Sequence, residues 1–187
     1  MINEVRKNSV NRMLGKYGME RCHAEQVRNL SLIIFDKTKG LIHDLSENDR
    51  ELLEAGALLH DIGYYISAKG HHKNAQILIN RDRLEGFSER EVEIIGKIAR
   101  YHKGRLPKKR HVLFSKLAAF VRLSDALDRT HCNVVNDMDF VLDSLVGVLV
   151  VYLKLNTPSY YFEICKAQDK KDLFEREFGF EVQLRVG

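Results

Sequence analysis

The spacing of hydrophobic residues changes near residue 134, and this change divides the chain into two parts. Up to about residue 133, hydrophobic residues recur every three to four positions, which is the spacing of amphipathic helices. The helical segments fall at about 3–17, 21–37, 46–63, 71–81, 88–102 and 112–131. Beyond residue 134 the spacing becomes two, which is typical of strands. We therefore expect a helical domain over 1–133 and a small α+β subdomain over 134–187.

Local signals mark the ends of these elements. Ser46 with Asp49, and Ser88 with Glu91, can form capping boxes at helix starts. In the tail, 134–142 and 146–155 predict two strands joined by a turn, 158–178 predicts a helix, and 180–186 predicts a third strand. The fold class is therefore mainly α, a helical bundle with a β-β-α-β tail. The second strand is apolar at both parities, which predicts a strand covered on both faces or nearly so, and an uncovered face would favour a homodimer.

Composition narrows the classes of partner. The 187 residues are 44% hydrophobic, which is enough for a core, and the net charge is +4. This mildly basic balance suits a small anionic ligand, and the sequence has no basic stripe with interleaved aromatics for nucleic acid. Three widely separated cysteines, no apolar leader and no apolar run near 18 residues predict reduced thiols, a cytoplasmic location and no membrane span.

The pair His60-Asp61 is the strongest chemical feature. It follows an apolar run and precedes Gly63, and imidazole nitrogen and carboxylate oxygen together suit a divalent metal. The alternative is a surface pair that hydrogen-bonds locally. Near the start of another predicted helix stands His23, and Asp125 lies within the segment 112–131. Arg122, Asp125 and Arg129 are spaced i, i+3, i+7 and share one face, either an ordinary solvent-facing stripe or a ligand flanked by phosphate-binding guanidiniums.

Other histidines gather at helix ends. His71-His72 opens one predicted helix and His102 closes another, just before the basic loop 103–110. That loop is either solvated or faces phosphate. We interpret His43, His111 and His131 as structural or exposed.

The order His23, His60-Asp61, Asp125 resembles the HD superfamily of metal-dependent phosphohydrolases. The strings LLHDIGYYIS, HHKNAQILI, LEGFSEREVEIIGKIARYHKGRLP and RLSDALDRTH resemble the C-terminal region of the exopolyphosphatase and guanosine pentaphosphate phosphohydrolase (Ppx/GppA) family, as does the tail. The resemblance implies an HD-type bundle and a divalent ion (Mn, Fe, Ni, Co, Mg or Zn). It assigns the first ion to His23, His60, Asp61 and Asp125. A second ion would take His71 and His102, with His72 as a competitor for His71.

The resemblance also implies a function. We expect a metal-dependent phosphohydrolase, with Asp61 and His60 as catalytic residues, acting on a phosphorylated small molecule or nucleotide. Five basic residues are candidates to bind phosphate: Lys73, Lys103, Arg105, Arg122 and Arg129. The family's polyphosphate-cleaving site lies in two actin-like domains with glycine-rich loops, which this sequence does not contain. The alternative is therefore a regulatory module that binds metal or ligand and dimerises or docks to a polyphosphatase core.

Overall fold

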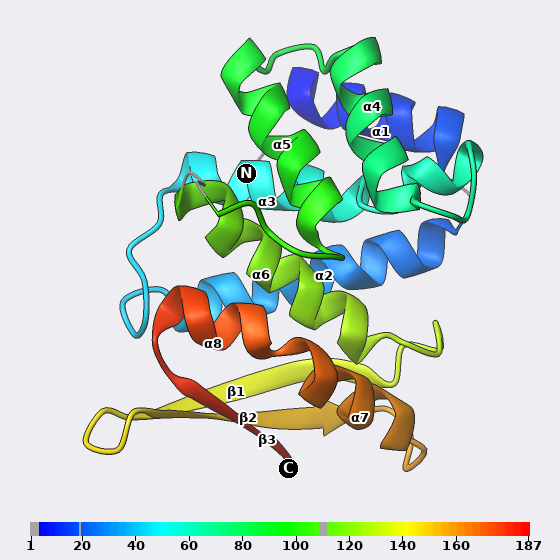
Figure 1. Cartoon of the computed structure of the whole chain (residues 1–187). Coiled ribbons are helices and arrows are strands. Elements are labelled where there is room, and N and C mark those ends of the chain that lie inside the picture. Colours follow the sequence, from blue (N-terminus) through cyan, green and yellow to red (C-terminus); the bar gives the residue numbers. More distant parts are fainter. Residues whose placement is uncertain (1–3, 19, 109–111) are drawn as a thin grey trace.

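The computed structural model describes residues 4–18, 20–108 and 112–187 (Figure 1). It confirms a mainly helical chain with a small sheet at the C-terminal end. The helices are α1 (Glu4–Tyr17), α2 (Arg21–Thr38), α3 (Glu47–Leu58), the 3-10 helix η1 (Ile62–Tyr65), α4 (His71–Asp82), α5 (Glu89–Tyr101), α6 (Val112–Leu127), α7 (Tyr161–Lys170) and α8 (Asp172–Phe178). The strands are β1 (Val135–Asp143), β2 (Val148–Leu155) and β3 (Glu181–Val186).

Helix α6 lies at the centre of the molecule. Figure 1 shows it between α3 and α5 above and the tail below, and it contacts α2, α3, α5, α7 and α8. Twelve of its 16 residues are buried, in agreement with its mostly apolar sequence. Phe120 of this helix packs against Phe35 of α2 and Phe174 of α8, so one continuous core joins the helical part to the tail. This packing holds fixed the helix that carries Asp125.

Both predicted capping boxes are confirmed. Ser46 accepts a hydrogen bond from the backbone N–H of Asp49, and Asp49 accepts one from the backbone N–H of Ser46. Ser88 and Glu91 make the same reciprocal pair at the start of α5. Such caps satisfy amides that the first helical turn leaves unpaired.

The helix expected to reach Gly63 ends earlier. Helix α3 stops at Leu58, and a turn then leads through His60 and Asp61 into η1. Asp61 has φ −109° and ψ 5°, in the sparsely populated bridge region where active-site residues often lie. Neighbours on a helix would diverge by about 100°. Because these two residues lie in a turn instead, their side chains reach the same place.

The tail forms a three-stranded sheet of order β1-β2-β3. Strands β1 and β2 pair antiparallel, whereas β2 and β3 pair parallel. A parallel pair needs a crossover connection, and α7 with α8 supplies it. Leu149, Val151 and Leu153 of β2 are fully buried against the helices. The other face of β2 is half-buried, so one face is fully covered and the other partly covered, close to the expectation that both faces are covered or nearly so.

The helix expected over 158–178 is two helices, and the tail is β-β-α-α-β. Helix α7 ends at Lys170, and α8 begins at Asp172. Leu173 and Phe174 are buried against the α6 side of the core. Helices α7 and α8 both contact α6. The chain changes direction between them, which lets α8 bury Leu173 and Phe174 in the core.

The residues that the structure describes contain neither a disulfide nor a membrane-spanning helix. The cysteines Cys22, Cys132 and Cys165 are free, exposed thiols. Among residues 4–18, 20–108 and 112–187, no helix combines the length and the apolar character needed to cross a membrane.

Candidate metal centre

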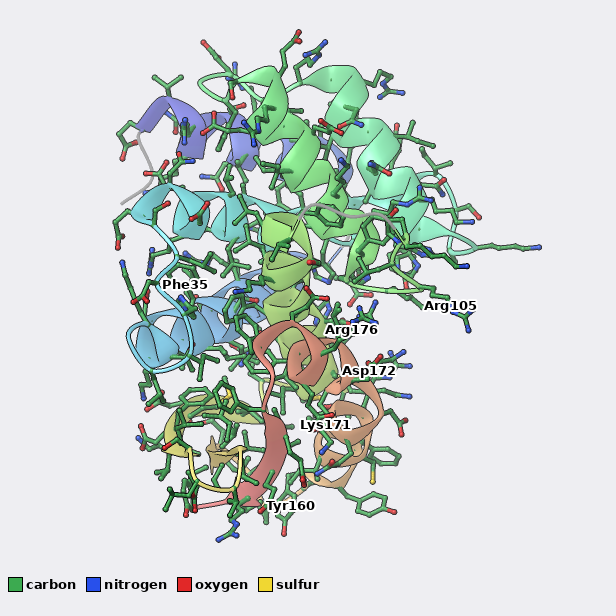
Figure 2. All side chains as sticks on the ribbon, turned by 60° about the vertical axis from the view of Figure 1, so that its left-hand side comes forward. Phe35, Arg105, Tyr160, Lys171, Asp172 and Arg176 are labelled. Atoms are coloured by element: carbon green, nitrogen blue, oxygen red, sulfur yellow. The ribbon has the colours of Figure 1, made fainter. Side chains whose placement is uncertain are left out.

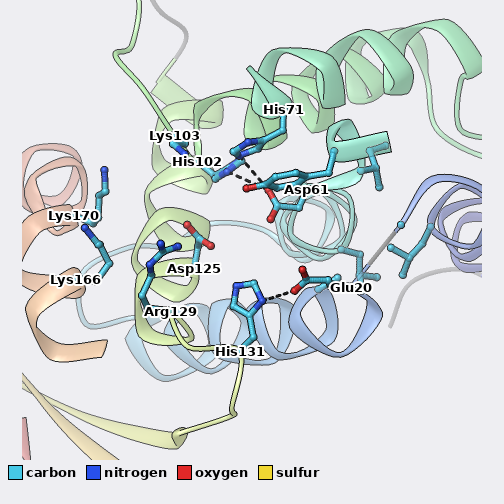
Figure 3. Close-up of a pocket in the computed structure, with 16 residues that line it drawn as sticks. Glu20, Asp61, His71, His102, Lys103, Asp125, Arg129, His131, Lys166 and Lys170 are labelled. Carbon is cyan, nitrogen blue, oxygen red and sulfur yellow. Dashed lines mark hydrogen bonds and ion pairs between the residues drawn. The ribbon is translucent and has the colours of Figure 1, made fainter. Parts of the chain in front are cut away.

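Asp61 lies between two groups of histidines, and Figure 3 shows one of them, His71 and His102. Its Oδ2 atom is 3.5 Å from Nε2 of His60 and 3.9 Å from Nε2 of His23. Its Oδ1 atom is 3.4 Å from Nε2 of His71 and 3.6 Å from Nε2 of His102. The two oxygens of one carboxylate therefore face two different pairs of imidazoles. Two groups could each hold a metal ion, His23 with His60 and Asp61, and Asp61 with His71 and His102.

Asp125 of α6 lies on the His23 side of this cluster. Its Oδ1 atom is 3.3 Å from Nε2 of His23 and 3.9 Å from Nε2 of His60. Ligands bound to one cation at about 2.0–2.2 Å are themselves roughly 3–4 Å apart. The four residues that the resemblance assigns to a first ion thus come together from α2, the turn after α3, and α6.

Hydrogen bonds at Nδ1 fix the orientation of the rings. His60, His71 and His102 each contact the carbonyl oxygen three residues earlier, at 2.7, 3.1 and 2.6 Å. A carbonyl can only accept, so Nδ1 carries the proton and Nε2 presents its lone pair to the cluster. His23 differs, because its Nδ1 lies 2.8 Å from Oδ2 of Asp128, which is fully buried. A carboxylate behind a histidine is a common way to orient a metal ligand.

Burial and neighbouring charges set the ionisation of the cluster. Burial favours the neutral acid of Asp61 and Asp125, but nearby histidines outweigh it and lower the pKa of both carboxyls. Burial, followed by the nearby His60, lowers the pKa of His102 to about 4, so this ring is neutral at pH 7. For His23 burial also lowers the pKa, but contacts with Asp125 and Asp128 reverse this and raise it to about 9.

The cluster fits a divalent cation. Nε2 of His60 and Oδ1 of Asp61 are buried and make no hydrogen bond. A buried polar atom without a partner costs free energy, and cations bound on the two sides of Asp61 would remove that cost, one at Nε2 of His60 and the other at Oδ1 of Asp61. Nitrogen and oxygen donors in this mixture suit first-row transition metals.

A cavity of about 390 Å³ opens beside the cluster (Figure 3). Asp61, Asp125, His71 and His102 line it. Its other polar lining residues are Glu20, Tyr64, Lys103, Arg129, His131, Lys166 and Lys170. A small molecule in this cavity would therefore touch both the candidate metal ligands and several cations.

The predicted phosphate-binding residues fall into three groups. Lys103 and Arg129 line the cavity. Lys73 and Arg105 are exposed and lie outside its lining, and Figure 2 shows Arg105 at the outer edge of the molecule. Arg122 is buried and donates through Nη2 to the carbonyl oxygens of Tyr101 and Gly104, at 3.1 and 2.5 Å. Its guanidinium therefore joins α6 to the end of α5 and does not face the cavity.

The remaining histidines occupy different places. His72 belongs to neither candidate metal group. His43 is buried, and its Nε2 lies 3.1 Å from the carbonyl oxygen of Phe35. His111 lies outside the described residues. His131, which we interpreted as structural or exposed, lines the cavity, stacks on His23 with ring centroids 3.8 Å apart, and contacts the carboxylate of Glu20.

Sequence reasoning missed six polar residues of the site. They are Glu20, Tyr64, Asp128, His131, Lys166 and Lys170. Asp128 and His131 carried a weak signal, because both follow Asp125 closely at the end of a polar helix face. The two lysines carried none, since only the folding of the tail against α6 brings α7 to the cavity.

Fold and site together define a helical domain with a buried His/Asp cluster beside a basic cavity. A family model described as Ppx/GppA phosphatase, domain III, matches residues 5–132, and the chain therefore belongs to the Ppx/GppA phosphatase family. It is also similar to the guanosine-5'-triphosphate,3'-diphosphate pyrophosphatase of Pseudoalteromonas translucida (strain TAC 125), with 28% identity over 105 residues. That alignment covers 56% of this chain and 21% of the relative, so the chain spans about a fifth of the relative's length.

Proposed function

We propose that this chain is an HD-type, metal-dependent phosphohydrolase that acts on a phosphoester or nucleotide. The observation that carries the proposal is the position of Asp61, whose two oxygens face two separate pairs of histidine nitrogens. His23, His60, Asp61 and Asp125 would hold one divalent ion, and Asp61, His71 and His102 a second. Membership of a phosphatase family and a relative named as a nucleotide pyrophosphatase support the reaction class.

The chain's own residues then have distinct roles. A bound divalent ion polarises a phosphoryl oxygen and lowers the pKa of a bound water. Asp61 and Asp125 are ionised, and the Nδ1 contacts hold His60, His71 and His102 with Nε2 toward the cluster. Lys103 and Arg129 line the cavity, where they would bind phosphate groups of the substrate.

Metal binding is tested first. Purified protein is analysed for its elements, and its thermal unfolding is followed with Mn²⁺, Fe²⁺, Co²⁺, Ni²⁺, Zn²⁺ and Mg²⁺. An ion at 100 times its dissociation constant should stabilise the fold by about 2.7 kcal/mol. No bound metal and no shift with any of the ions would contradict the proposal.

Hydrolysis is tested next, with a panel of nucleotides and phosphoesters. Asp61→Asn should abolish metal-dependent turnover, because the amide cannot replace a charged carboxylate facing both groups. Asp44→Asn is the matched control, since Asp44 is an exposed carboxylate outside the cavity lining, and it should keep full activity.

Metal binding without turnover would favour the alternative, a regulatory module that dimerises or docks to a larger protein. The outer face of the sheet supports this alternative, because Val150 and Tyr152 are half-buried there and Val141 is exposed. A molecular mass that corresponds to a monomer at every concentration would exclude the homodimer.

A further inference from the structure

Four cationic side chains line the cavity, and two of them come from the C-terminal tail. Lys103 follows α5 and Arg129 follows α6, whereas Lys166 and Lys170 lie on α7. Figure 3 shows the two α7 lysines on the same side as Arg129, with Asp125 between them and Asp61 in this view. The cavity therefore has a basic wall on the side of Asp125 that faces away from Asp61.

A buried contact fixes this wall in place. Glu163, Lys166 and Lys170 are spaced i, i+3, i+7 and share one face of α7. Glu163 is fully buried, and its Oε1 accepts hydrogen bonds from the backbone N–H of Thr130 at 3.1 Å and from its hydroxyl at 2.5 Å. Thr130 directly follows Arg129. The contact therefore holds the lysine-bearing face of α7 beside the end of α6.

The protein itself neutralises little of this positive charge. Lys166 lies 3.3 Å from Asp169 in a solvent-exposed pair. Within residues 4–18, 20–108 and 112–187, no ion pair holds Lys103, Arg129 or Lys170. Like charges at i, i+4 on a helix repel each other, so Lys166 and Lys170 together destabilise α7 unless an anion lies between them. Cations gathered on one wall of a cavity without carboxylate partners fit an anionic ligand.

We propose that Lys166, Lys170 and Arg129 form a subsite for a phosphate group that is not the one at the metal centre. The inference rests on the proposed phosphohydrolase function and names its substrate class, compounds that carry at least two phosphoryl groups. A phosphate group carries about −1.5 to −2 charges at pH 7 and several acceptor oxygens, which two lysines and a guanidinium can satisfy together. The subsite holds the substrate, and the metal centre reacts with its other end.

Binding of inorganic pyrophosphate tests the subsite apart from any activity. Isothermal titration of the full chain in the presence of a chelator compares the parent with the double variant Lys166→Gln/Lys170→Gln, called the cavity variant below. The control is Lys7→Gln/Lys69→Gln, which removes the same charge from two exposed lysines outside the cavity lining. A charge-assisted hydrogen bond contributes about tenfold in affinity, so the cavity variant should bind about 100-fold more weakly and the control within about twofold. Undetectable binding by the parent, or equal binding by parent and cavity variant, would overturn the subsite.

Kinetics separate failure of the subsite from failure of the proposed function. For a substrate with two phosphoryl groups, the cavity variant should raise KM by about 100-fold and leave kcat unchanged, while KM for a monophosphate stays within about twofold. If this variant raised KM equally for both substrates, the subsite would be contradicted and the phosphohydrolase proposal would stand. Asp61→Asn should lose turnover and keep pyrophosphate binding in chelator. If the parent hydrolyses nothing, the phosphohydrolase proposal fails, and the titration still decides the subsite.

Discussion

Replacing Gly63 with alanine would test how η1 and α4 position the second histidine pair. A Cβ atom on Gly63 would lie 1.9 Å from the carbonyl oxygen of His71 and 2.5 Å from the backbone nitrogen of Ala75. These atoms belong to the backbone of α4 and cannot rotate away. Restoring an ordinary contact of 3.4 Å requires η1 and α4 to separate by about 1.5 Å. Because His71 starts α4, the same movement displaces its ring from Asp61.

The expected cost follows from this overlap. Overpacking costs about 1–3 kcal/mol where side chains can adjust, so a clash with backbone should reach about 3 kcal/mol or more. Urea denaturation followed by circular dichroism measures the change in unfolding free energy, and metal analysis measures the ions bound per chain. We expect Gly63→Ala to lose the ion assigned to His71 and His102 and to keep the ion assigned to His23 and His60.

Two other glycines provide controls. A Cβ on Gly15 meets nothing within 4 Å, so Gly15→Ala in α1 should stabilise the protein by up to about 1 kcal/mol. A Cβ on Gly56 lies 2.5 Å from Cγ2 of Ile98, so Gly56→Ala should disturb core packing and leave the stoichiometry of metal binding unchanged. If Gly63→Ala were as stable as the parent and bound as much metal, the link between this close approach and the position of His71 would be refuted.

Three further predictions concern single carboxylates. Asp128→Asn removes the charge behind His23 and should weaken metal affinity about 10–100-fold, measured by competition with a chelating dye. A hydrogen bond from Lys37, the largest contribution, lowers the pKa of Asp137 to about 2, below its unfolded value of about 3.9. The stabilisation that the ionised Asp137 gives to the fold is therefore present above pH 4 and is lost as the pH falls toward 2. Asp137→Asn should remove that part of the acid dependence, less than about 1 kcal/mol at this partly exposed site. Glu163→Ala removes two hydrogen bonds to Thr130 from a buried carboxylate and should lower the unfolding free energy by about 1–3 kcal/mol, measured by denaturation. Metal binding should persist, and a loss of bound metal would contradict this prediction.

Local signals were sufficient for much of the fold. The helical spacing predicted α1 to α6 to within a few residues, except that α3 ends before Gly63 and α6 before residue 131. The capping boxes were predictable because a serine and an acidic residue three positions later satisfy each other without tertiary help. The break between α7 and α8 was not, because burial of Leu173 and Phe174 on the core decides it.

For the candidate site too, the sequence predicted what neighbouring residues decide and missed what tertiary packing decides. His60 and Asp61 stand next to each other in the sequence, and the family resemblance supplied His23 and Asp125. Which cations face the cavity depends on tertiary packing. Arg122 shares a helical face with Asp125 by spacing, yet its guanidinium is held by backbone carbonyls. The lysines of α7 lie more than 40 residues beyond Asp125 in the sequence, and no periodic pattern connects them to it.

The division of the cavity between two parts of the chain has an evolutionary consequence. The family match ends at residue 132, so it includes every candidate metal ligand but not α7. Substitutions in that one helix could change which anions are accepted while the ligands inherited in the helical part stay the same. If the proposed subsite is right, a protein with this His/Asp cluster and a different α7 should select different anions.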